Sequence, residues 1–423
     1  MKKTLVALAA IAATSAFAQS TVTISGFGNM SYDLFSISQG KAAAARTSNT
    51  SEDRVTDNSG RIIFNSNEDL GGGMRAFWQV DVRPLQDATA RLNAVCATPA
   101  VTAAGVVTTT AAIPASVCSP GLNPLNGGNS HIGLSGSLGS IRMGRQDIHY
   151  TEGGNFAPVS NPTIHSHAGL LTTAAAGQNV GRASRTANLI WYTSPTFNGF
   201  NGTLGYSTNG ASVSGWSDVE NDIASAQRKG STQYARLGYT QGPVTAVVSY
   251  VNEKSDYIGT AADATSGATV YAAQAPQADR NGTIVSVKYD LGVAKLGIAS
   301  SSANSTAMAA GAAGAVSKRT NTQFGVGVPM GASNFAVTYT RVGNVSAAGV
   351  EQANTGASSV ALAYSYDLSK RTQLFAGMQT ITNKSLGAHS LFYNADNVVG
   401  SQGSSAIAGE KHSVTSFGVR HSF

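Results

Sequence analysis

The sequence has little charge, few cysteines and, beyond its first residues, no long apolar run. Only 12% of its 423 residues are Asp, Glu, Lys or Arg, and it has two cysteines. After residue 18 no stretch approaches the roughly 18 consecutive apolar residues of a membrane-spanning helix. The formal charge of +6 is too small to indicate a nucleic-acid-binding surface. Neither a helical pattern nor a linker divides the chain, which favours one large unit over several soluble domains.

The N-terminus has the pattern of a secretory signal peptide. Lys2 and Lys3 precede an apolar run over residues 4–17, and a small-residue triplet ends at Ala18. A short buried helix is the alternative, but the flanking charge and the triplet favour removal of residues 1–18. Without the two lysines, 26 basic residues face 22 acidic ones, a mature excess of +4.

Cys96 and Cys118 lie in one polar segment of this exported chain. Export favours a disulfide that closes a loop, and two free thiols are the alternative.

Period-two alternation of apolar and polar residues, interrupted by very short turns, predicts seven β-hairpins. With an opening strand over residues 21–34 and a closing strand over 413–423, the count is 1 + 14 + 1, or sixteen strands. The hairpins cover residues 60–84, 131–147, 186–207, 232–251, 283–300, 322–342 and 358–382.

The connections between hairpins are long and rich in Ala, Ser, Gly and Thr, whereas the turns within them are short. This asymmetry predicts an all-β fold over residues 19–423: a 16-stranded antiparallel transmembrane β-barrel with short periplasmic turns and long extracellular loops. A soluble β-sandwich is the alternative, but it seldom sorts its connections by length. The chain ends on Phe423, and we expect the last strand to close the barrel against the first, with this aromatic ring at the membrane interface.

The alternation also separates the two faces of the sheet. In residues 360–366 the large side chains fall on one face and Ala361, Ala363 and Ser365 on the other. Lys288 and Asp290 likewise alternate with apolar neighbours. Apolar residues therefore face lipid, and small or charged residues face a wet interior.

Several arginines fall on the predicted inner face, opposite apolar rows. Sixteen strands leave an aqueous channel, and inward guanidinium groups, charged at any relevant pH, favour anions in it. Each arginine could instead lie at the rim or in a subunit salt bridge. The inward set is Arg61, Arg75, Arg83, Arg142 and Arg236.

The connection over residues 147–185 is the third long one. Its only acids are Asp147 and Glu152, and its basic residues come late, at Arg182 and Arg185. If it folds into the lumen, a weakly acidic loop faces a basic wall, which again predicts an anion preference.

The segments EDLGGGMRAFWQVD, GSIRMGRQD, NLIWYTSPTFNGFNGTLGYS, LSKRTQLFAGM and GVRHSF resemble those of Gram-negative trimeric general porins of the beta-proteobacterial type. The resemblance implies a homotrimer in the outer membrane, surrounded by lipid, with the third loop as constriction and passive diffusion of small hydrophilic solutes and inorganic anions. By position, Arg61 and Arg182 resemble pore-wall arginines. His131 stands where some members have another arginine, and NFAPV replaces the acidic PEFGG-type motif of cation-preferring members.

No catalytic, phosphate-binding or cofactor motif is present, and we expect no cofactor or metal. His165 and His167 could share a metal, but no third ligand is near, so two solvated loop histidines are favoured. Two other functions remain open: a substrate-specific channel for organic acids or phosphate, and an outer-membrane hydrolase with a Ser/His pair at the rim.

Overall fold

The computed structural model describes thirteen stretches of the chain. They are residues 21–38, 51–58, 60–84, 128–149, 152, 170–172, 186–208, 229–256, 259–262, 269–272, 279–306, 316–390 and 407–423. In these stretches no helix is long and apolar enough to cross a membrane. The expected signal peptide, residues 1–18, and the expected Cys96–Cys118 pair lie outside them.

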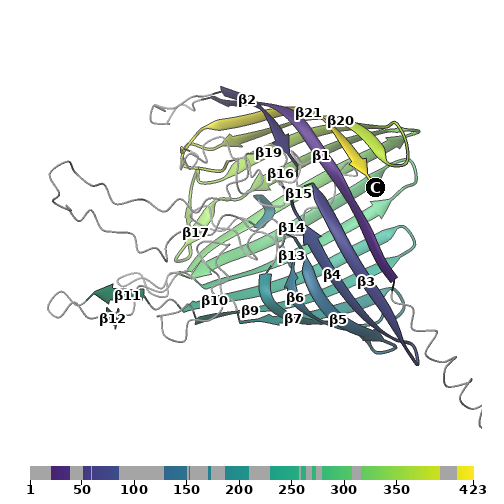
Figure 1. The fold of residues 1–423 in the computed structure, drawn as a ribbon. Helices are drawn as coiled ribbons and strands as arrows, with labels where there is room; N and C mark the ends of the chain where they lie inside the picture. Colours follow the sequence, from purple (N-terminus) through teal and green to yellow (C-terminus); the bar gives the residue numbers. More distant parts are fainter. Residues whose placement is uncertain are drawn as a thin grey trace, which may run out of the picture.

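Sixteen strands form a closed antiparallel barrel, seen from the side in Figure 1. The main sheet has 19 strands, and removing the short strands β2, β17 and β18 leaves these 16. Each pairs with the next along the chain, and the last pairs with the first. Their bounds are β1 Thr21–Ser38, β3 Arg61–Gly71, β4 Met74–Val82, β5 Ser130–Gly136, β6 Gly139–Gln146, β7 Thr186–Thr193, β8 Phe200–Ser207, β9 Lys229–Gln241, β10 Val244–Asp256, β13 Asp279–Asp290, β14 Lys295–Thr306, β15 Val316–Met330, β16 Ser333–Val342, β19 Ala357–Asp367, β20 Thr372–Asn383 and β21 Lys411–Ser422.

The remaining strands extend the end of the barrel that carries the long connections. The strand β2 (Ser51–Asp57) continues the edge of β1 beyond the part that pairs with β3. The strands β17 (Val345–Ala347) and β18 (Val350–Gln352) form a small hairpin between β16 and β19. The strands β11 (Gly259–Ala262) and β12 (Thr269–Ala272) form a separate two-stranded sheet.

All seven predicted hairpins are present, and their turns gather at one end of the barrel (Figure 1). The turn of the first hairpin is very short, because β3 continues to Gly71 and β4 begins at Met74. Gly71, Gly72 and Gly73 all have positive φ, a backbone conformation that glycine adopts readily. The chain therefore reverses within the glycines, and Glu68 and Asp69 remain in β3.

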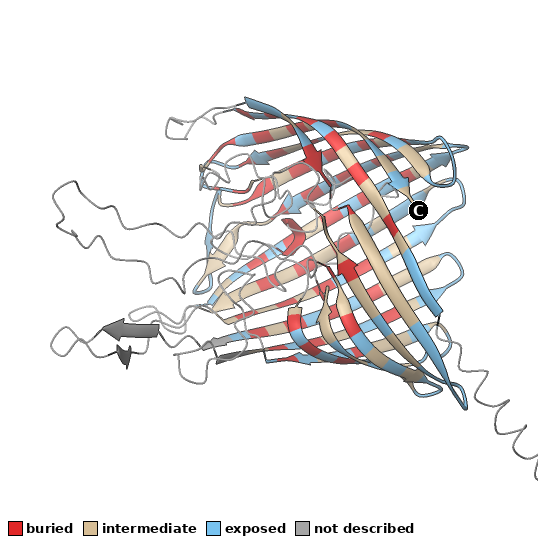
Figure 2. Cartoon of the chain, viewed as in Figure 1, coloured by how far each residue is buried: buried red, intermediate tan, exposed pale blue. Residues whose placement is uncertain are grey.

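The two faces of the sheet are those predicted from the alternation. In β19, Val360 and Leu362 are 45% and 43% exposed, whereas Ala361 and Ser365 are 1% and 0% exposed. Figure 2 shows the same alternation of buried and exposed positions along the strands. Because large apolar side chains point outward and small or polar ones inward, the outer surface suits hydrocarbon and the inner surface suits water.

The barrel closes at Phe423. Its backbone N–H donates to the carbonyl of Gly26 at 3.0 Å, and the N–H of Gly26 donates to the Phe423 carbonyl at 3.3 Å. Above this point twelve residues of β1 pair with β21, from Phe27 with Ser422 to Ser38 with Lys411. The final residue is therefore part of the seam that removes the sheet edge.

Candidate functional site: the inner wall of the barrel

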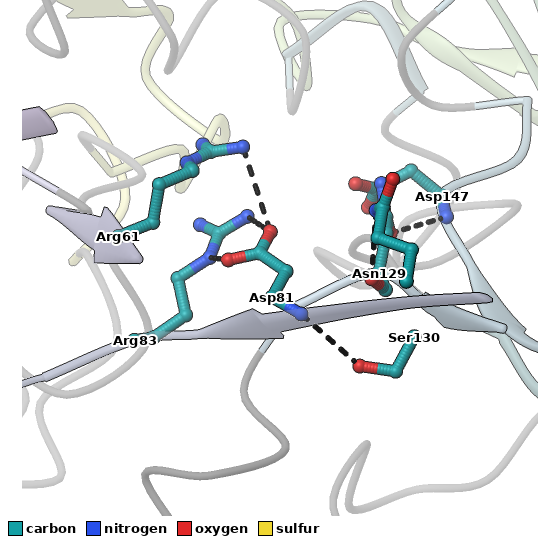
Figure 3. Close-up of polar contacts among 7 residues, drawn as sticks. Arg61, Asp81, Arg83, Asn129, Ser130 and Asp147 are labelled. Atoms are coloured by element: carbon teal, nitrogen blue, oxygen red, sulfur yellow. Dashed lines mark hydrogen bonds and ion pairs between the residues drawn. The ribbon is translucent and has the colours of Figure 1, made fainter. Parts of the chain in front are cut away.

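A cluster of charged side chains lines the inner wall along the neighbouring strands β21, β1, β3 and β4. Figure 3 shows its central part. Arg83 forms a fork with Asp81, with Nε to Oδ1 at 3.1 Å and Nη2 to Oδ2 at 2.9 Å. From the neighbouring strand, Arg61 Nη1 lies 3.6 Å from the same Oδ2. One carboxylate therefore holds two guanidinium groups.

The Asp81 carboxylate is buried beside Gly128. Its side chain is 1% exposed, against 27% for Arg61 and 16% for Arg83. The backbone N–H of Gly128 donates to the Asp81 carbonyl at 2.9 Å, and a Cβ at Gly128 would lie 1.9 Å from the Asp81 Cγ. The side chains of Arg61 and Arg83 are therefore more exposed than the Asp81 carboxylate that they share.

A third guanidinium group joins the cluster through an aromatic ring. Phe27 of β1 lies between Arg61, whose Cζ is 4.8 Å from the ring centroid, and Arg420 of β21, whose Cζ is 4.0 Å away. Such contacts stabilise a cation by about 0.5–2 kcal/mol. We call Arg61, Asp81, Arg83 and Arg420 the basic cluster, and its three cations and one anion give these four residues a net charge of +2. The carboxylate of Asp147, outside these four residues, also attracts Arg61 electrostatically.

The other described arginines of the sequence prediction lie elsewhere on the wall. Arg142 reaches across Gly133 and places its Cζ 4.9 Å above the ring of Phe77. Arg75 is on the same face of β4 as Asp81 but is exposed beside the turn, away from the basic cluster. Arg182 and Arg185 fall outside the described residues.

His131, which stands where some members of the resembled family have an arginine, packs among aromatic rings. It is 8% exposed, and its ring lies edge-on to Trp191 at 5.4 Å and to Phe77 at 6.0 Å between centroids. This position adds packing to the wall and presents no guanidinium group.

Glu152, in the connection over residues 147–185, contacts the opposite wall. Its Oε1 accepts from Arg236 Nε at 2.7 Å and from the Tyr234 hydroxyl at 3.2 Å, both on β9. Its backbone carbonyl accepts from the Ser286 hydroxyl of β13 at 3.2 Å. Arg236 also donates to Asn201 Oδ1 at 2.7 Å, which fixes the guanidinium plane.

Other described residues of the same connection also contact inward-facing positions. The carbonyl of Leu171 accepts from the Ser301 hydroxyl and, at 2.9 Å, from Asn321 Nδ2, while its side chain packs against Ile284. His149 Nδ1 lies 2.8 Å from the Ser249 hydroxyl of β10. Burial lowers the pKa of His149 to about 3, so this imidazole is neutral at physiological pH.

Two members of the basic cluster, Asp81 and Arg420, were not among the residues predicted from the sequence. Asp81 lies two residues before Arg83 and so on the same face of its strand, a signal available from the alternation alone. Arg420 is in the final strand, where pairing with the first strand predicts that it approaches Phe27.

The comparisons agree with this architecture. The profile of the Gram-negative porins matches residues 4–386. The chain is 25% identical to outer membrane porin protein 32 of Delftia acidovorans over the full length of both. It superposes on the anion-selective porin from Comamonas acidovorans with a TM-score of 0.65 at 20% identity, covering 96% of this chain and 100% of that one. It superposes on OmpT of Vibrio cholerae with a TM-score of 0.55 at 13% identity, covering 96% and 98%. The chain is thus a multi-pass outer-membrane protein with the fold of a channel, and it belongs to the family of Gram-negative porins.

Proposed function

We propose that the barrel is a water-filled channel for passive diffusion of small hydrophilic solutes and that it prefers anions. The observation that carries the preference is the difference in exposure within the basic cluster. Its guanidinium groups reach the lumen, whereas Asp81 is 1% exposed. A row of fixed cations on a pore wall raises the local concentration of anions. The name of the Comamonas porin, described as anion-selective, supports the same preference.

We further propose that the connection over residues 147–185 narrows the pore. Its described residues make the contacts with β9, β10, β13, β14 and β15 given above, which fits a segment lying inside the barrel. Arg182 and Arg185 would then face the same passage. Cleavage after Ala18 and the Cys96–Cys118 disulfide are proposals that rest on the sequence. The homotrimer is a proposal that rests on the resemblance to trimeric general porins.

Reversal potentials in a KCl gradient test the proposed preference. Purified protein in a planar bilayer is expected to give the sign of an anion-preferring pore. The preference should weaken as salt rises, because the Debye length falls from about 10 Å at 0.1 M to about 3 Å at 1 M. A cation-preferring sign would contradict the proposal. Saturable block by one organic acid or phosphate at micromolar concentration would indicate a substrate-specific channel instead.

Replacing Glu152 by glutamine tests the proposed constriction. The change removes the charge-assisted bond to Arg236, which contributes about 1–3 kcal/mol, and so loosens the loop from the wall. We expect the open-channel current noise of Glu152→Gln to rise several-fold, as measured in single-channel records.

The matched control is Glu351→Gln, because it removes the same charge from an exposed position on β18. Equal noise in the two variants would mean that Glu152 does not hold the constriction in place.

A further inference from the structure

Phenylalanine rings on the inner wall of the barrel lie against guanidinium groups at three separate places. In each, the arginine Cζ is 4.0–4.9 Å from the centroid of the ring. The pairs are Arg54 with Phe35, Arg142 with Phe77, and both Arg61 and Arg420 with Phe27. A ring supports one face of a guanidinium group and leaves the edge of the group, with its N–H donors, available to a solute.

Arg420 of β21 has a ring contact but no carboxylate partner. The carboxylate of Asp81 pairs with the other two arginines of the basic cluster, whereas none of the ion pairs in the described part of the chain includes Arg420. Arg420 and Phe27 are both partly exposed. Because the adjacent Val419 points outward and is 43% exposed, Arg420 points into the lumen. Its guanidinium group can therefore donate to a carboxylate that a solute brings.

Arg142 of β6 repeats this arrangement on another part of the wall. Strand pairing places Arg142 opposite Gly133 of β5, and Gly133 opposite Phe77 of β4. A Cβ at Gly133 would lie 2.7 Å from the Phe77 Cζ and 2.9 Å from the Arg142 Cγ, so glycine at this position lets the guanidinium group reach the ring. Arg142 is also partly exposed, and the ion pairs of the described stretches do not include it either.

A guanidinium group beside an aromatic ring distinguishes a flat carboxylate from a puckered one of the same charge. In an aromatic acid the carboxylate and the ring are coplanar. While the carboxylate accepts from the guanidinium edge, the ring of the acid can contact the neighbouring phenylalanine or stack on a guanidinium face. A saturated ring of the same size has no π face, and its hydrogens project out of the plane. It keeps the charge contact and loses the ring contact.

We propose that the inner wall binds aromatic carboxylates as they pass, at Arg420 with Phe27 and at Arg142 with Phe77. At each place the carboxylate of the solute accepts from the guanidinium group, and its ring lies against the arginine–phenylalanine pair. The contacts are few, so binding is weak and the solute leaves by diffusion. This inference rests on the proposed function, because it needs a pore that admits anions, and it adds the class of anion that is retained longest.

Block of the chloride current by two acids of equal charge and similar size tests the proposal. The probes are benzoate and cyclohexanecarboxylate, added in the millimolar range to the purified wild-type channel in a planar bilayer. The half-blocking concentration of benzoate is expected to be about threefold lower, as one added ring contact provides. Arg420→Lys and Arg142→Lys keep the charge but remove the flat group, so each should reduce this difference. The double variant should abolish it and keep the Cl⁻/K⁺ permeability ratio of the wild type.

Arg75→Lys is the matched control, because Arg75 faces the lumen from β4 but is exposed beside the turn and has no ring contact among the described residues. It should keep the threefold difference. Gel mobility of unboiled samples confirms that each variant is folded. Equal block by the two acids in the wild type, or an unchanged difference in the double variant, would overturn the proposal. With an anion-preferring reversal potential, equal block contradicts this inference alone, whereas a cation-preferring potential contradicts the proposed function as well.

Discussion

Asp81→Asn is expected to raise the Cl⁻/K⁺ permeability ratio of the channel, and Arg61→Gln is expected to lower it. The first change takes the basic cluster from a net charge of +2 to +3, and the second takes it to +1, because the cluster consists of three cations and one carboxylate. One unit charge about 5 Å from a passing ion contributes about 0.8 kcal/mol in water, a fourfold effect on local ion concentration. Screening reduces this value, so each variant should shift the ratio about two- to fourfold at 0.1 M salt.

The asparagine keeps the shape of the site. Its side-chain oxygen still accepts from Arg83, and it remains enclosed behind Gly128. Arg61 loses only a 3.6 Å contact and keeps its position over Phe27. The expected rise therefore reflects added charge and not a displaced wall.

Arg75→Gln is the control for this charge series, because Arg75 lies on the same face of β4 but is exposed beside the turn. Reversal potentials in the same KCl gradient should leave its ratio close to the wild-type value. A shift as large as that of Arg61→Gln would mean that net lumen charge, and not the basic cluster, sets the preference.

The strands and their faces could be predicted because lipid and water impose a period of two on every membrane-spanning segment. That signal fades toward the long connections. The sequence pattern began one strand at Thr322, whereas β15 begins at Val316. Above the hydrocarbon both faces of a strand can be polar, as at Thr322 outward and Asn321 inward, so alternation no longer marks the strand.

The composition of the wall could be predicted, but its groupings could not. Alternation places Arg61, Arg75 and Arg83 on one face without showing that two of them share Asp81 and that the third lies near the turn. Such groupings depend on strand register, which pairing geometry determines. The contacts of Glu152 with β9 are even harder to predict from the sequence, because they join residues more than 80 positions apart. Glu152 also lies in a connection that has no regular alternation of apolar and polar residues.

Gly26→Ala is expected to prevent normal closure of the barrel. A Cβ at this position would lie 2.2 Å from the backbone oxygen of Arg61 on β3 and 2.8 Å from the Cζ of Phe423. The ring of Phe423 can move, but the Arg61 carbonyl is fixed where β1 pairs with β3. Overpacking of this kind costs about 1–3 kcal/mol or more, and here it pushes β1 away from β3 at the residue that also bonds Phe423 at the seam.

Refolding into detergent, followed by gel mobility of unboiled samples across a urea series, measures this effect. Gly202→Ala is the matched control, because a Cβ there would have no neighbour nearer than 3.9 Å. The control should refold like the wild type, whereas Gly26→Ala should give a lower folded fraction and unfold at lower urea. Gly418→Ala, on the other strand of the seam, should behave like Gly26→Ala, since its Cβ would lie 2.4 Å from the Met30 carbonyl oxygen. Equal resistance to urea in both seam variants and the control would contradict this prediction. The close approach of β1 to β3 and β21 would then not be required for closure of the barrel.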